Sequence, residues 1–350
     1  MNWESLDWEV LDRLRETFLS DAKSAGPYWH TITDLECYDA TYGERIGWKW
    51  DAVLRELRLR GWSPPPGATM LDWGCGSGVP GRRVIDFFGT QNFPRLVVWD
   101  HSPLAVEFAE RKARKVFPAL TVEAADTRFL RGDEPIGVLV VSHVLNELDD
   151  NACADLAVLL SRAQTVLWVE PGTHEVSRAL VGWREKLLGD FRAVAPCTHQ
   201  AACGLIAPEN ERHWCHHFAS PPAELYADSD WVRFGQRAGI DLRSLPYSFL
   251  VLDRRPASGP ASEPGDSRIL GEPRHYKGYA KLFNCSATGI EELMLQQRAD
   301  KVLFKALKRA RGPLLYRWTR TAGQITAAAP LFPDSKSDNL TADLTDDTDG

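Results

Sequence analysis

The stretch Leu71-Asp72-Trp73-Gly74-Cys75-Gly76-Ser77-Gly78 decides the fold that this sequence predicts. It follows a short apolar run and precedes a helical pattern, so its three glycines stand at a turn between a strand and a helix. Glycine allows backbone conformations that a side chain would exclude and allows a ligand to approach the main chain closely. We therefore expect a nucleotide-like ligand at this turn.

Outward from this turn, short apolar runs alternate with helical stretches up to about residue 170. The runs occupy residues 69–72, 96–100, 138–141 and 165–169. Continuous apolar strands that are separated by helices indicate a parallel sheet covered on both faces. The sequence therefore predicts an α/β fold.

The details of the turn distinguish between two kinds of ligand site. A dinucleotide-binding fingerprint would have a small residue where Val79 stands, whereas here Asp72 lies two residues before the first glycine. The pattern resembles motif I of the class I S-adenosylmethionine-dependent methyltransferases. That resemblance implies a Rossmann-like, mostly parallel sheet of seven strands. It also implies that Asp100, at the end of the second strand, holds the ribose hydroxyls of the cofactor.

Further matches to that pattern follow in chain order. Ala125-Asp126 is expected at the end of the third strand, near the adenine, and residues 142–148 follow the fourth strand and would face the methyl donor. His143 or Glu147 could act as a base, or could orient the cofactor or cap a helix, so no catalytic residue is assigned. The residues expected to bind S-adenosylmethionine are Asp72, Gly74, Cys75, Gly76, Gly78, Asp100, Asp126 and Ser142.

A second set of candidate site residues is a group of cysteines. The expected metal ligands are Cys197, Cys203, Cys215 and Cys285. Four thiolates suit either Zn²⁺ or an iron–sulfur cluster, and the spacing does not choose between these two. A site of three cysteines and one histidine remains an alternative, with His199, His213, His216 and His217 as candidates. Buried cysteines without a ligand are the other alternative, and they account for Cys37, Cys75 and Cys153.

Several signatures together resemble one family. They are motif I, Leu145-Asn146-Glu147-Leu148, Trp168-Val169-Glu170-Pro171-Gly172-Thr173, Cys197-x-His199, Trp214-Cys215-His216 and Cys285. Over roughly residues 38–290 the chain resembles the mitochondrial small-ribosomal-subunit methyltransferase-like proteins and their bacterial relatives. The resemblance implies a [4Fe–4S] cluster on the four cysteines and association with small-subunit ribosomal RNA during assembly. The family pattern often has Pro where Thr198 and Gly204 stand, and His217 interrupts its usual Trp-Cys-His-Phe, which favours a bacterial-type member.

Charge is distributed unevenly along the chain. The net charge is −7, and residues 334–350 contribute −5 of it, because six Asp face Lys336 alone. Between residues 298 and 320, in contrast, eight Lys and Arg face only Asp300. This segment is expected to bind RNA phosphates, with Tyr316 and Trp318 as rings for base stacking, or to be a solvated helix face. Arg274 and Lys277, which precede the strand of Cys285, could extend the basic patch toward the cysteines.

Composition and sequence pattern predict the protein class, the localisation and the domain organisation. With 44% hydrophobic and 25% charged residues, the 350-residue chain is typical of a globular protein. No apolar run approaches the ~18 residues of a membrane span, and the N-terminus lacks a signal pattern, so a cytoplasmic monomer is expected. The predicted organisation is a helical extension (1–66), a cofactor-binding core (67–192), a Cys-rich metal-binding insertion (193–246), closing antiparallel strands at 248–252 and 279–283 within 247–289, a basic helical segment (290–333) and an acidic disordered tail (334–350).

Three functions fit these features. The first is a methyltransferase-like protein that acts on small-subunit ribosomal RNA or on ribosome assembly and carries a four-cysteine iron–sulfur cluster. The second is a non-catalytic RNA-binding assembly factor that uses the cofactor and the metal structurally. The third is a small-molecule methyltransferase with a zinc site. The Asp/Asn-Pro-Pro-aromatic motif of amino-group methylation does not follow the fourth strand, which leaves the second function open.

Overall fold

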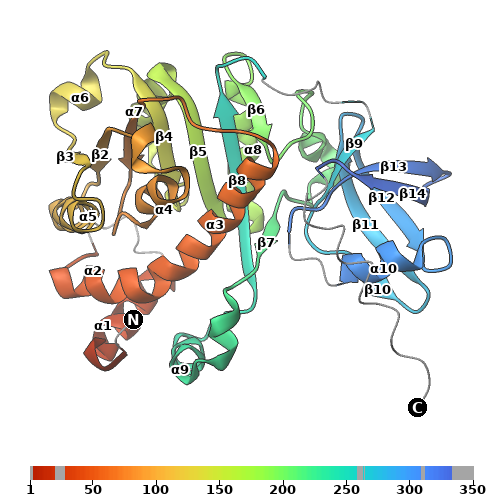
Figure 1. Cartoon of the computed structure of the whole chain (residues 1–350), viewed down its shortest axis with the longest axis horizontal. Coiled ribbons are helices and arrows are strands. Elements are labelled where there is room, and N and C mark those ends of the chain that lie inside the picture. The colour runs from red at the N-terminus through yellow and green to blue at the C-terminus, as the bar shows by residue number, and fades with distance from the viewer. Residues whose placement is uncertain (1–2, 20–27, 258–262, 264, 309–311, 333–350) are drawn as a thin grey trace.

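A computed structural model describes residues 3–19, 28–257, 263, 265–308 and 312–332. Figure 1 shows a larger α/β part that contains the N-terminal helices and a smaller part built mainly from the C-terminal strands. The acidic tail predicted for residues 334–350 lies outside the described residues. Within the described residues, no helix is long and apolar enough to span a bilayer.

The larger part is built on an eight-stranded sheet with the order β3-β2-β1-β4-β5-β8-β6, in which β7 pairs with β8. Its strands are β1 (Thr69–Trp73), β2 (Arg95–Trp99), β3 (Thr121–Ala124), β4 (Ile136–Ser142), β5 (Ala163–Pro171), β6 (Arg192–Ala195), β7 (His217–Ala219) and β8 (Leu245–Asp253). Strands β1 to β5 pair in parallel, and β8 pairs antiparallel with its neighbours. The predicted α/β fold with a mostly parallel sheet is therefore confirmed, with β7 as an addition to the seven strands that were expected.

Helices cover both faces of this sheet, as its apolar strands require. The helices are α1 (Trp8–Leu19), α2 (Ile32–Tyr38), α3 (Glu44–Leu59), α4 (Val79–Phe88), α5 (Pro103–Val116), α6 (Thr127–Arg131), α7 (Asp150–Arg162), α8 (His174–Leu187) and α9 (Ser229–Ala238). Neighbouring strand residues point to opposite faces, so Met70 belongs to the same apolar cluster as Leu54 and Leu57 of α3, whereas Leu71 belongs to the cluster that contains Leu156 of α7. Figure 1 shows α3 running diagonally across one face.

The smaller part is a closed β-barrel. Its strands are β9 (Asp266–Ile269), β10 (Arg274–Tyr276), β11 (Tyr279–Ser286), β12 (Gly289–Gln296), β13 (Leu315–Thr321) and β14 (Gln324–Pro330), and α10 (Lys301–Lys308) connects β12 to β13. Because β9 pairs with both β11 and β13, the order β9-β11-β12-β14-β13 closes on itself, with β10 beside β11. Leu282, Leu293, Leu295 and Phe304 fill its core.

Two expectations for this region were wrong. The runs at 248–252 and 279–283 do not close one sheet together, because the first lies in β8 of the large sheet and the second in β11 of the barrel. In the described part of 290–333 only α10 is helical, and most of the other residues belong to β12, β13 and β14. The spacing of the apolar residues in β12 also fits a helix. The segment is a strand because it pairs with β11 along its whole length, which the spacing alone does not show.

Candidate functional site

A cavity of about 270 Å³ opens where β1, β2 and β4 end. The glycine-rich turn lines it from β1, Asp100 lines it from β2, and Ser142 and His143 line it from β4. Ligands of open α/β sheets bind at this carboxyl edge, in the crevice between strands whose connections run in opposite directions. The cavity is therefore the candidate cofactor site.

The glycine turn is held in place by β2 and by close packing. The N–H groups of Gly74 and Cys75 both donate to the carbonyl oxygen of Trp99, at 2.8 and 2.9 Å. Gly74 has φ +70°, and a Cβ there would lie 2.6 Å from Cγ1 of Val144. Any other residue at position 74 would be strained and would also clash, which explains why the motif needs glycine here.

Asp100 is rigidly oriented at the rim of the cavity. Its Oδ2 accepts the N–H of Gly76 and its Oδ1 accepts the N–H of Ser102, both at 2.9 Å. Burial raises the pKa of this carboxyl above its ordinary value, while these two backbone donors oppose that shift. The carboxylate is thus fixed at the end of β2, with its side chain 7% exposed.

The cavity does not bring all the expected cofactor residues together. It is lined by Gly74, Cys75, Gly76, Asp100 and Ser142, but not by Asp72, Gly78 or Asp126. Asp72 lies buried below the turn, where its Oδ2 accepts the N–H of Gly81 at 3.0 Å and burial raises its pKa to about 7. Gly78 begins α4, and Asp126 caps α6 by accepting the N–H of Phe129 at 2.7 Å.

Sequence reasoning missed the aromatic wall of the cavity. Tyr28, Trp29 and Tyr38, from the N-terminal region, line the cavity together with the turn. Trp99 lines it from β2, with its ring stacked on that of Trp73 at 5.2 Å between centroids. The only signal in the sequence was the density of aromatic residues, which does not distinguish a cavity wall from a core.

His143 and Lys49 form a buried polar contact beside the cavity. Nε2 of His143 lies 3.1 Å from Nζ of Lys49, and Nδ1 lies 3.1 Å from Oγ of Ser142, which also accepts the Nε1–H of Trp50. Burial lowers the pKa of Lys49 to about 7 and that of His143 well below its ordinary value. His143 also has φ +57°, which is a strained conformation for a residue with a Cβ.

The four predicted metal-ligand cysteines lie around a second, much smaller cavity of about 30 Å³. Cys197 follows β6, Cys203 precedes a short 3₁₀ turn, Cys215 precedes β7, and Cys285 lies on β11 of the barrel. The cavity is closed by apolar side chains that include Val181 and Leu205. All four thiols are free, and burial raises the pKa of Cys203 to about 11.

The predicted metal-binding insertion is not shown as a metal site. Among the described residues, no three Cys, His, Asp or Glu side chains are arranged to hold a single metal ion. Nε2 of His199 lies 3.8 Å from the sulfur of Cys285, and Nε2 of His217 lies 3.7 Å from that of Cys215. His213 and His216 do not line the cysteine cavity, because their rings pack on Phe283 and Trp214.

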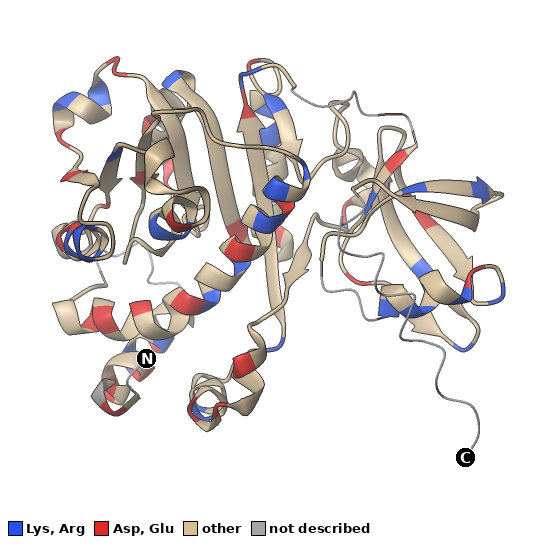
Figure 2. Ribbon diagram, viewed as in Figure 1, with Lys and Arg blue, Asp and Glu red and all other residues tan. Residues whose placement is uncertain are grey.

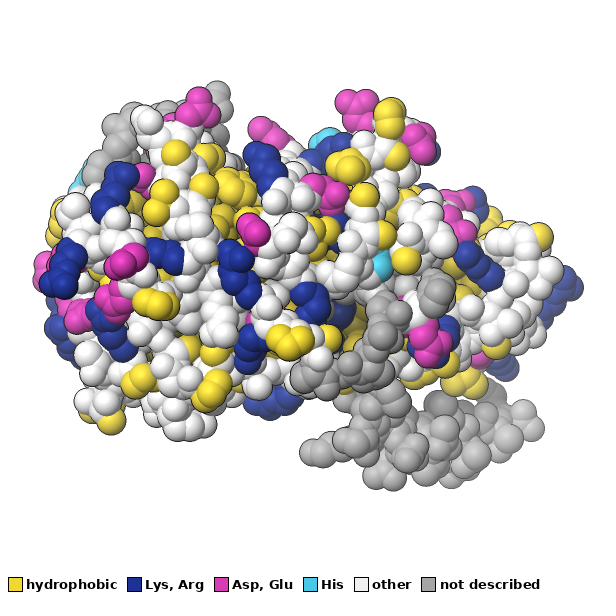
Figure 3. All heavy atoms as spheres, turned by 90° about the horizontal axis from the view of Figure 1, so that it is seen from above, with side chains coloured by type: hydrophobic (Ala, Val, Ile, Leu, Met, Phe, Trp, Pro, Cys, Tyr) yellow, Lys and Arg dark blue, Asp and Glu magenta, His cyan; other side chains and the backbone are white. Residues whose placement is uncertain are grey.

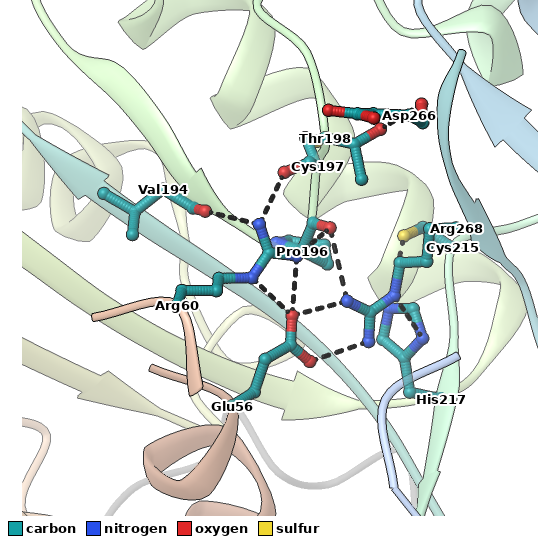
Figure 4. A network of polar contacts seen from close by, with 10 residues as sticks. All are labelled: Glu56, Arg60, Val194, Pro196, Cys197, Thr198, Cys215, His217, Asp266 and Arg268. Carbon is teal, nitrogen blue, oxygen red and sulfur yellow. Dashed lines mark hydrogen bonds and ion pairs between the residues drawn. The ribbon is translucent and has the colours of Figure 1, made fainter. Parts of the chain in front are cut away.

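A buried ion-pair network lies beside the cysteines. Figure 4 shows Glu56 of α3 between the guanidinium groups of Arg60 and Arg268, the latter from β9. Arg268 donates to both oxygens of Glu56 at 2.6 and 2.9 Å, and Arg60 donates to Oε1 at 2.9 Å. Arg60 also donates to the carbonyl oxygens of Val194, Pro196 and Cys197, at 2.9 to 3.0 Å. The network therefore joins α3, the cysteine loop and the barrel.

The buried charges around the cysteines do not cancel. Arg184 of α8 is 2% exposed; its Nε donates to the sulfur of Cys197 at 3.2 Å, and it pairs with Glu185. Together with Arg60 and Arg268, this gives three arginines against the two carboxylates of Glu56 and Glu185. The surroundings of the cysteine cavity thus carry one excess positive charge, which favours an anionic group there.

The described part of the predicted basic segment lies mostly on α10 and β13, and Arg309 and Arg311 lie outside the described residues. Arg317 pairs with Glu263 and Asp266, and Arg320 pairs with Glu291, so both arginines already have a counter-charge within the protein. The expectation that Trp318 presents a ring for base stacking was wrong. Trp318 is 9% exposed and donates its Nε1–H to Asn284 inside the barrel, because its position on β13 faces the core.

Three solved structures illustrate what the chain is similar to. A magnesium protoporphyrin IX methyltransferase from Synechocystis PCC 6803 is 14% identical, with 70% of this chain and 100% of that chain covered and a TM-score of 0.37. A SAM-dependent methyltransferase from Aquifex aeolicus is 15% identical, with 47% and 90% covered and a TM-score of 0.36. A precorrin 8w decarboxylase from Methanobacterium thermoautotrophicum is 12% identical, with 57% and 87% covered and a TM-score of 0.34.

Comparison with protein families gives a firmer result. No curated protein matches the chain. The family model described as mitochondrial small ribosomal subunit Rsm22 matches residues 53–315, which is more than half of the chain and contains the glycine turn and all four cysteines. The family resemblance expected from the sequence is confirmed, and the chain belongs to the Rsm22 family.

Proposed function

We propose that this protein binds S-adenosylmethionine in the cavity at the ends of β1, β2 and β4 and acts on small-subunit ribosomal RNA during ribosome assembly. The observation that carries the cofactor assignment is the joint placement of the glycine turn and Asp100 on one cavity. Free oxygen lone pairs of the Asp100 carboxylate suit ribose hydroxyls, and the aromatic rings of Tyr28 and Trp99 suit an adenine. When bound, the cofactor supplies an electrophilic methyl group.

One observation favours an assembly role without methyl transfer as the second candidate function. His143 stands where a base for the reaction is expected, but both of its ring nitrogens are within hydrogen-bond distance of groups of the chain, Lys49 and Ser142. A histidine in this arrangement positions its neighbours and has no free nitrogen that faces a substrate proton. Retention on small-subunit particles without methyl transfer would identify this second function.

A calorimetric titration with S-adenosylmethionine tests the cofactor assignment. Asp100→Ala should weaken binding at least about tenfold, because two charge-assisted hydrogen bonds are lost. Asp126→Ala is the matched control, since Asp126 does not line the cavity and should leave the affinity unchanged. Equal affinities of wild type and Asp100→Ala, with both chains folded, would refute the assignment.

We further propose that Cys197, Cys203, Cys215 and Cys285 hold a [4Fe–4S] cluster. The donor set fits this group, because all four donors are thiols at one cavity and the surroundings carry excess positive charge. A four-iron cluster is larger than a single ion, so its cysteines stand further apart than the ligands of one zinc. When bound, it would crosslink the loop after β6 to β11.

Anaerobic purification followed by iron, sulfide and zinc analysis tests this proposal. About four iron and four sulfide per chain are expected, with loss of both in Cys197→Ser and Cys285→Ser. Cys153→Ser is the matched control, because Cys153 lies on α7 and does not line the cysteine cavity. One zinc per chain would show that the cysteines hold zinc instead of a cluster, and the absence of both metals would refute the proposal.

A further inference from the structure

The connectivity of the barrel identifies a fold that the sequence did not reveal. Numbered in chain order from one to five, its strands are β9, β11, β12, β13 and β14, and they close in the order 1-2-3-5-4-1. The third and fifth strands pair in parallel through Met294–Gln324 and Leu295–Ile325, whereas the other pairs are antiparallel. With α10 between the third and fourth strands, this is the arrangement of an OB-fold.

In OB-folds the outer face of the second and third strands, with the loops at one end, binds oligonucleotides or oligosaccharides. Fold alone does not assign a ligand, so the side chains on that face must decide. On β11, Ala280 and Leu282 face the core. Because strand residues alternate, Tyr279 and Lys281 face outward, and their partners on β12, Gln296 and Met294, share that face.

Two stacked tyrosines stand at the open end of this face. Tyr276 of β10 pairs directly with Tyr279 of β11, and their rings stack with centroids 4.8 Å apart and an interplanar angle of 13°. Tyr276 is 45% exposed, which is a large exposed fraction for an aromatic side chain. Unlike Trp318, which faces the core, this pair presents a flat aromatic surface on which an unpaired base can stack.

The same face has an excess of positive charge. Strand pairing places Arg274, Lys281 and Glu292 on it, Lys277 lies in the turn between β10 and β11, and Arg298, just after β12, donates to the side chain of Gln296. Glu292 pairs with both Arg274 and Lys281, so one carboxylate offsets two cations. Figure 2 shows Lys and Arg on these strands and turns, whereas charges of both signs are interspersed over the top of the molecule in Figure 3. The local excess is complementary to phosphates.

The far half of the face is closed by the rest of the protein. Phe283 and Cys285, which follow Lys281 on the same side of β11, pack against the apolar cluster around the cysteines, and His213 lies on the ring of Phe283 with centroids 4.1 Å apart. What remains open is a narrow strip with rings at one end and cations along it. One row of phosphates with unstacked bases fits such a strip better than the two rows of a duplex.

We propose that the outer face of β10, β11 and β12 binds single-stranded RNA, with bases stacked on Tyr276 and Tyr279 and phosphates held by Arg274, Lys277, Lys281 and Arg298. This inference rests on the proposed ribosomal function for the origin of the RNA, and it adds the surface and the strandedness. It shares Arg274, Lys277 and Arg298 with the sequence expectation, but it assigns base stacking to Tyr276 and Tyr279 instead of Tyr316 and Trp318.

Fluorescence anisotropy with a labelled single-stranded RNA of about twelve nucleotides tests the proposal on the full chain. Tyr276→Ala and Tyr279→Ala should each weaken binding about tenfold, because each removes one stacking contact. Tyr226→Ala is the matched control, since Tyr226 is 54% exposed on a 3₁₀ turn before α9, outside the barrel, and should change nothing. Circular dichroism of each variant verifies folding.

Salt titration separates phosphate contacts from other effects. The logarithm of the binding constant should fall linearly with the logarithm of salt concentration, and Lys281→Gln should reduce that slope by about 0.7. Arg243→Gln, at an exposed site outside the barrel, should leave the slope unchanged. Unchanged RNA affinity in both tyrosine variants would overturn the proposal, as would equal affinity for a duplex of the same length.

The outcomes distinguish this inference from the proposed function. If the wild-type chain binds the RNA and the tyrosine variants bind it equally well, the inference fails and the ribosomal function stands. If the wild-type chain binds neither the RNA nor small-subunit particles, the ribosomal function fails as well. If the tyrosine variants no longer bind small-subunit particles but keep their affinity for the RNA, the face binds a ribosomal protein and the inference is refuted.

Discussion

Glu170, at the end of β5, is a carboxyl whose protonation depends on folding. It is fully buried, and its Oε1 accepts the Nε1–H of Trp168 at 2.7 Å and the N–H of Val144 at 3.2 Å. Its Oε2 has no partner among the described residues. Burial is the largest effect and raises the pKa of Glu170 from 4.5 to about 7, so the native state retains a proton that the unfolded chain releases.

We predict that Glu170 makes the protein less stable as pH rises from about 4.5 to 7. In that interval the native state binds more protons than the unfolded state, so the free energy of unfolding falls with pH by an amount on the order of 3 kcal/mol and is constant above it. Glu170→Gln should reduce the loss of stability between pH 5 and pH 8 by that amount, as measured by urea denaturation, while the buried carboxyl of Asp72, whose pKa is also raised to about 7, keeps its own contribution. Glu175→Gln, exposed on α8, serves as the control. An equal pH dependence in wild type and Glu170→Gln would contradict the prediction.

At the scale of residues, the sequence predicts side chains that belong to a local motif. Gly74 and Asp100 could be placed because the turn and the next strand end have a recognisable spacing, and both line the cavity. Asp126 has the expected spacing but caps α6 instead of lining the cavity. Lys49 and Tyr28 could not be found, because Lys49 comes from α3 and Tyr28 from the segment before α2, and the position of both depends on tertiary packing.

At the scale of elements, the Glu56 network fixes α3 against the barrel. Replacing Glu56 by Gln would leave Arg60 and Arg268 buried without a counter-charge. Breaking a buried pair in this way typically costs about 3–5 kcal/mol, so Glu56→Gln should lower the thermal midpoint by many degrees.

An exposed ion pair supplies the comparison for that variant. Asp155 and Arg131 lie 3.0 Å apart at the surface, so Asp155→Asn should cost less than about 1 kcal/mol. Thermal unfolding followed by circular dichroism measures both variants. Similar midpoints for Glu56→Gln and Asp155→Asn would show that the buried network does not stabilise the native state.

Helices and strands could be predicted where the hydrophobic pattern fits only one type of secondary structure. Residues 69–72 and 138–141 lie within β1 and β4, because a continuous apolar run in a buried parallel strand fits no other element of that length. Residues 279–283 do form a strand, but a strand pattern does not say which sheet it joins. β12 was expected as part of a helix, because the spacing of its apolar residues does not reveal that it pairs with β11.

At the scale of the whole molecule, the two sheets are joined by a few contacts near the cysteines. Three of the cysteines belong to segments of the larger part, and Cys285 belongs to β11, so a bound cluster would bridge the two parts. Among the described residues, further links are the ion pair between Glu56 and Arg268, the bond from Thr198 Oγ1 to the carbonyl oxygen of Asp266, and the bond from the N–H of Gly271 to the carbonyl oxygen of His216. The sequence predicted the four cysteines as one set but could not show that they connect two separately built sheets.

We therefore predict that loss of the cluster loosens the barrel and leaves the large sheet intact. Without the crosslink, local opening of residues 266–330 should need less free energy, whereas β1 to β5 keep their buried hydrogen bonds. Hydrogen exchange followed by mass spectrometry should show faster exchange in β11 and β12 after iron chelation and in Cys285→Ser, and unchanged exchange in β4. Cys153→Ser, which retains all four cavity cysteines, should exchange like the wild type. Uniform acceleration over both sheets would mean that the cluster stabilises one cooperative unit, and identical exchange in all chains would contradict the prediction, because the direct contacts between the two parts would then hold the barrel in place without the cluster.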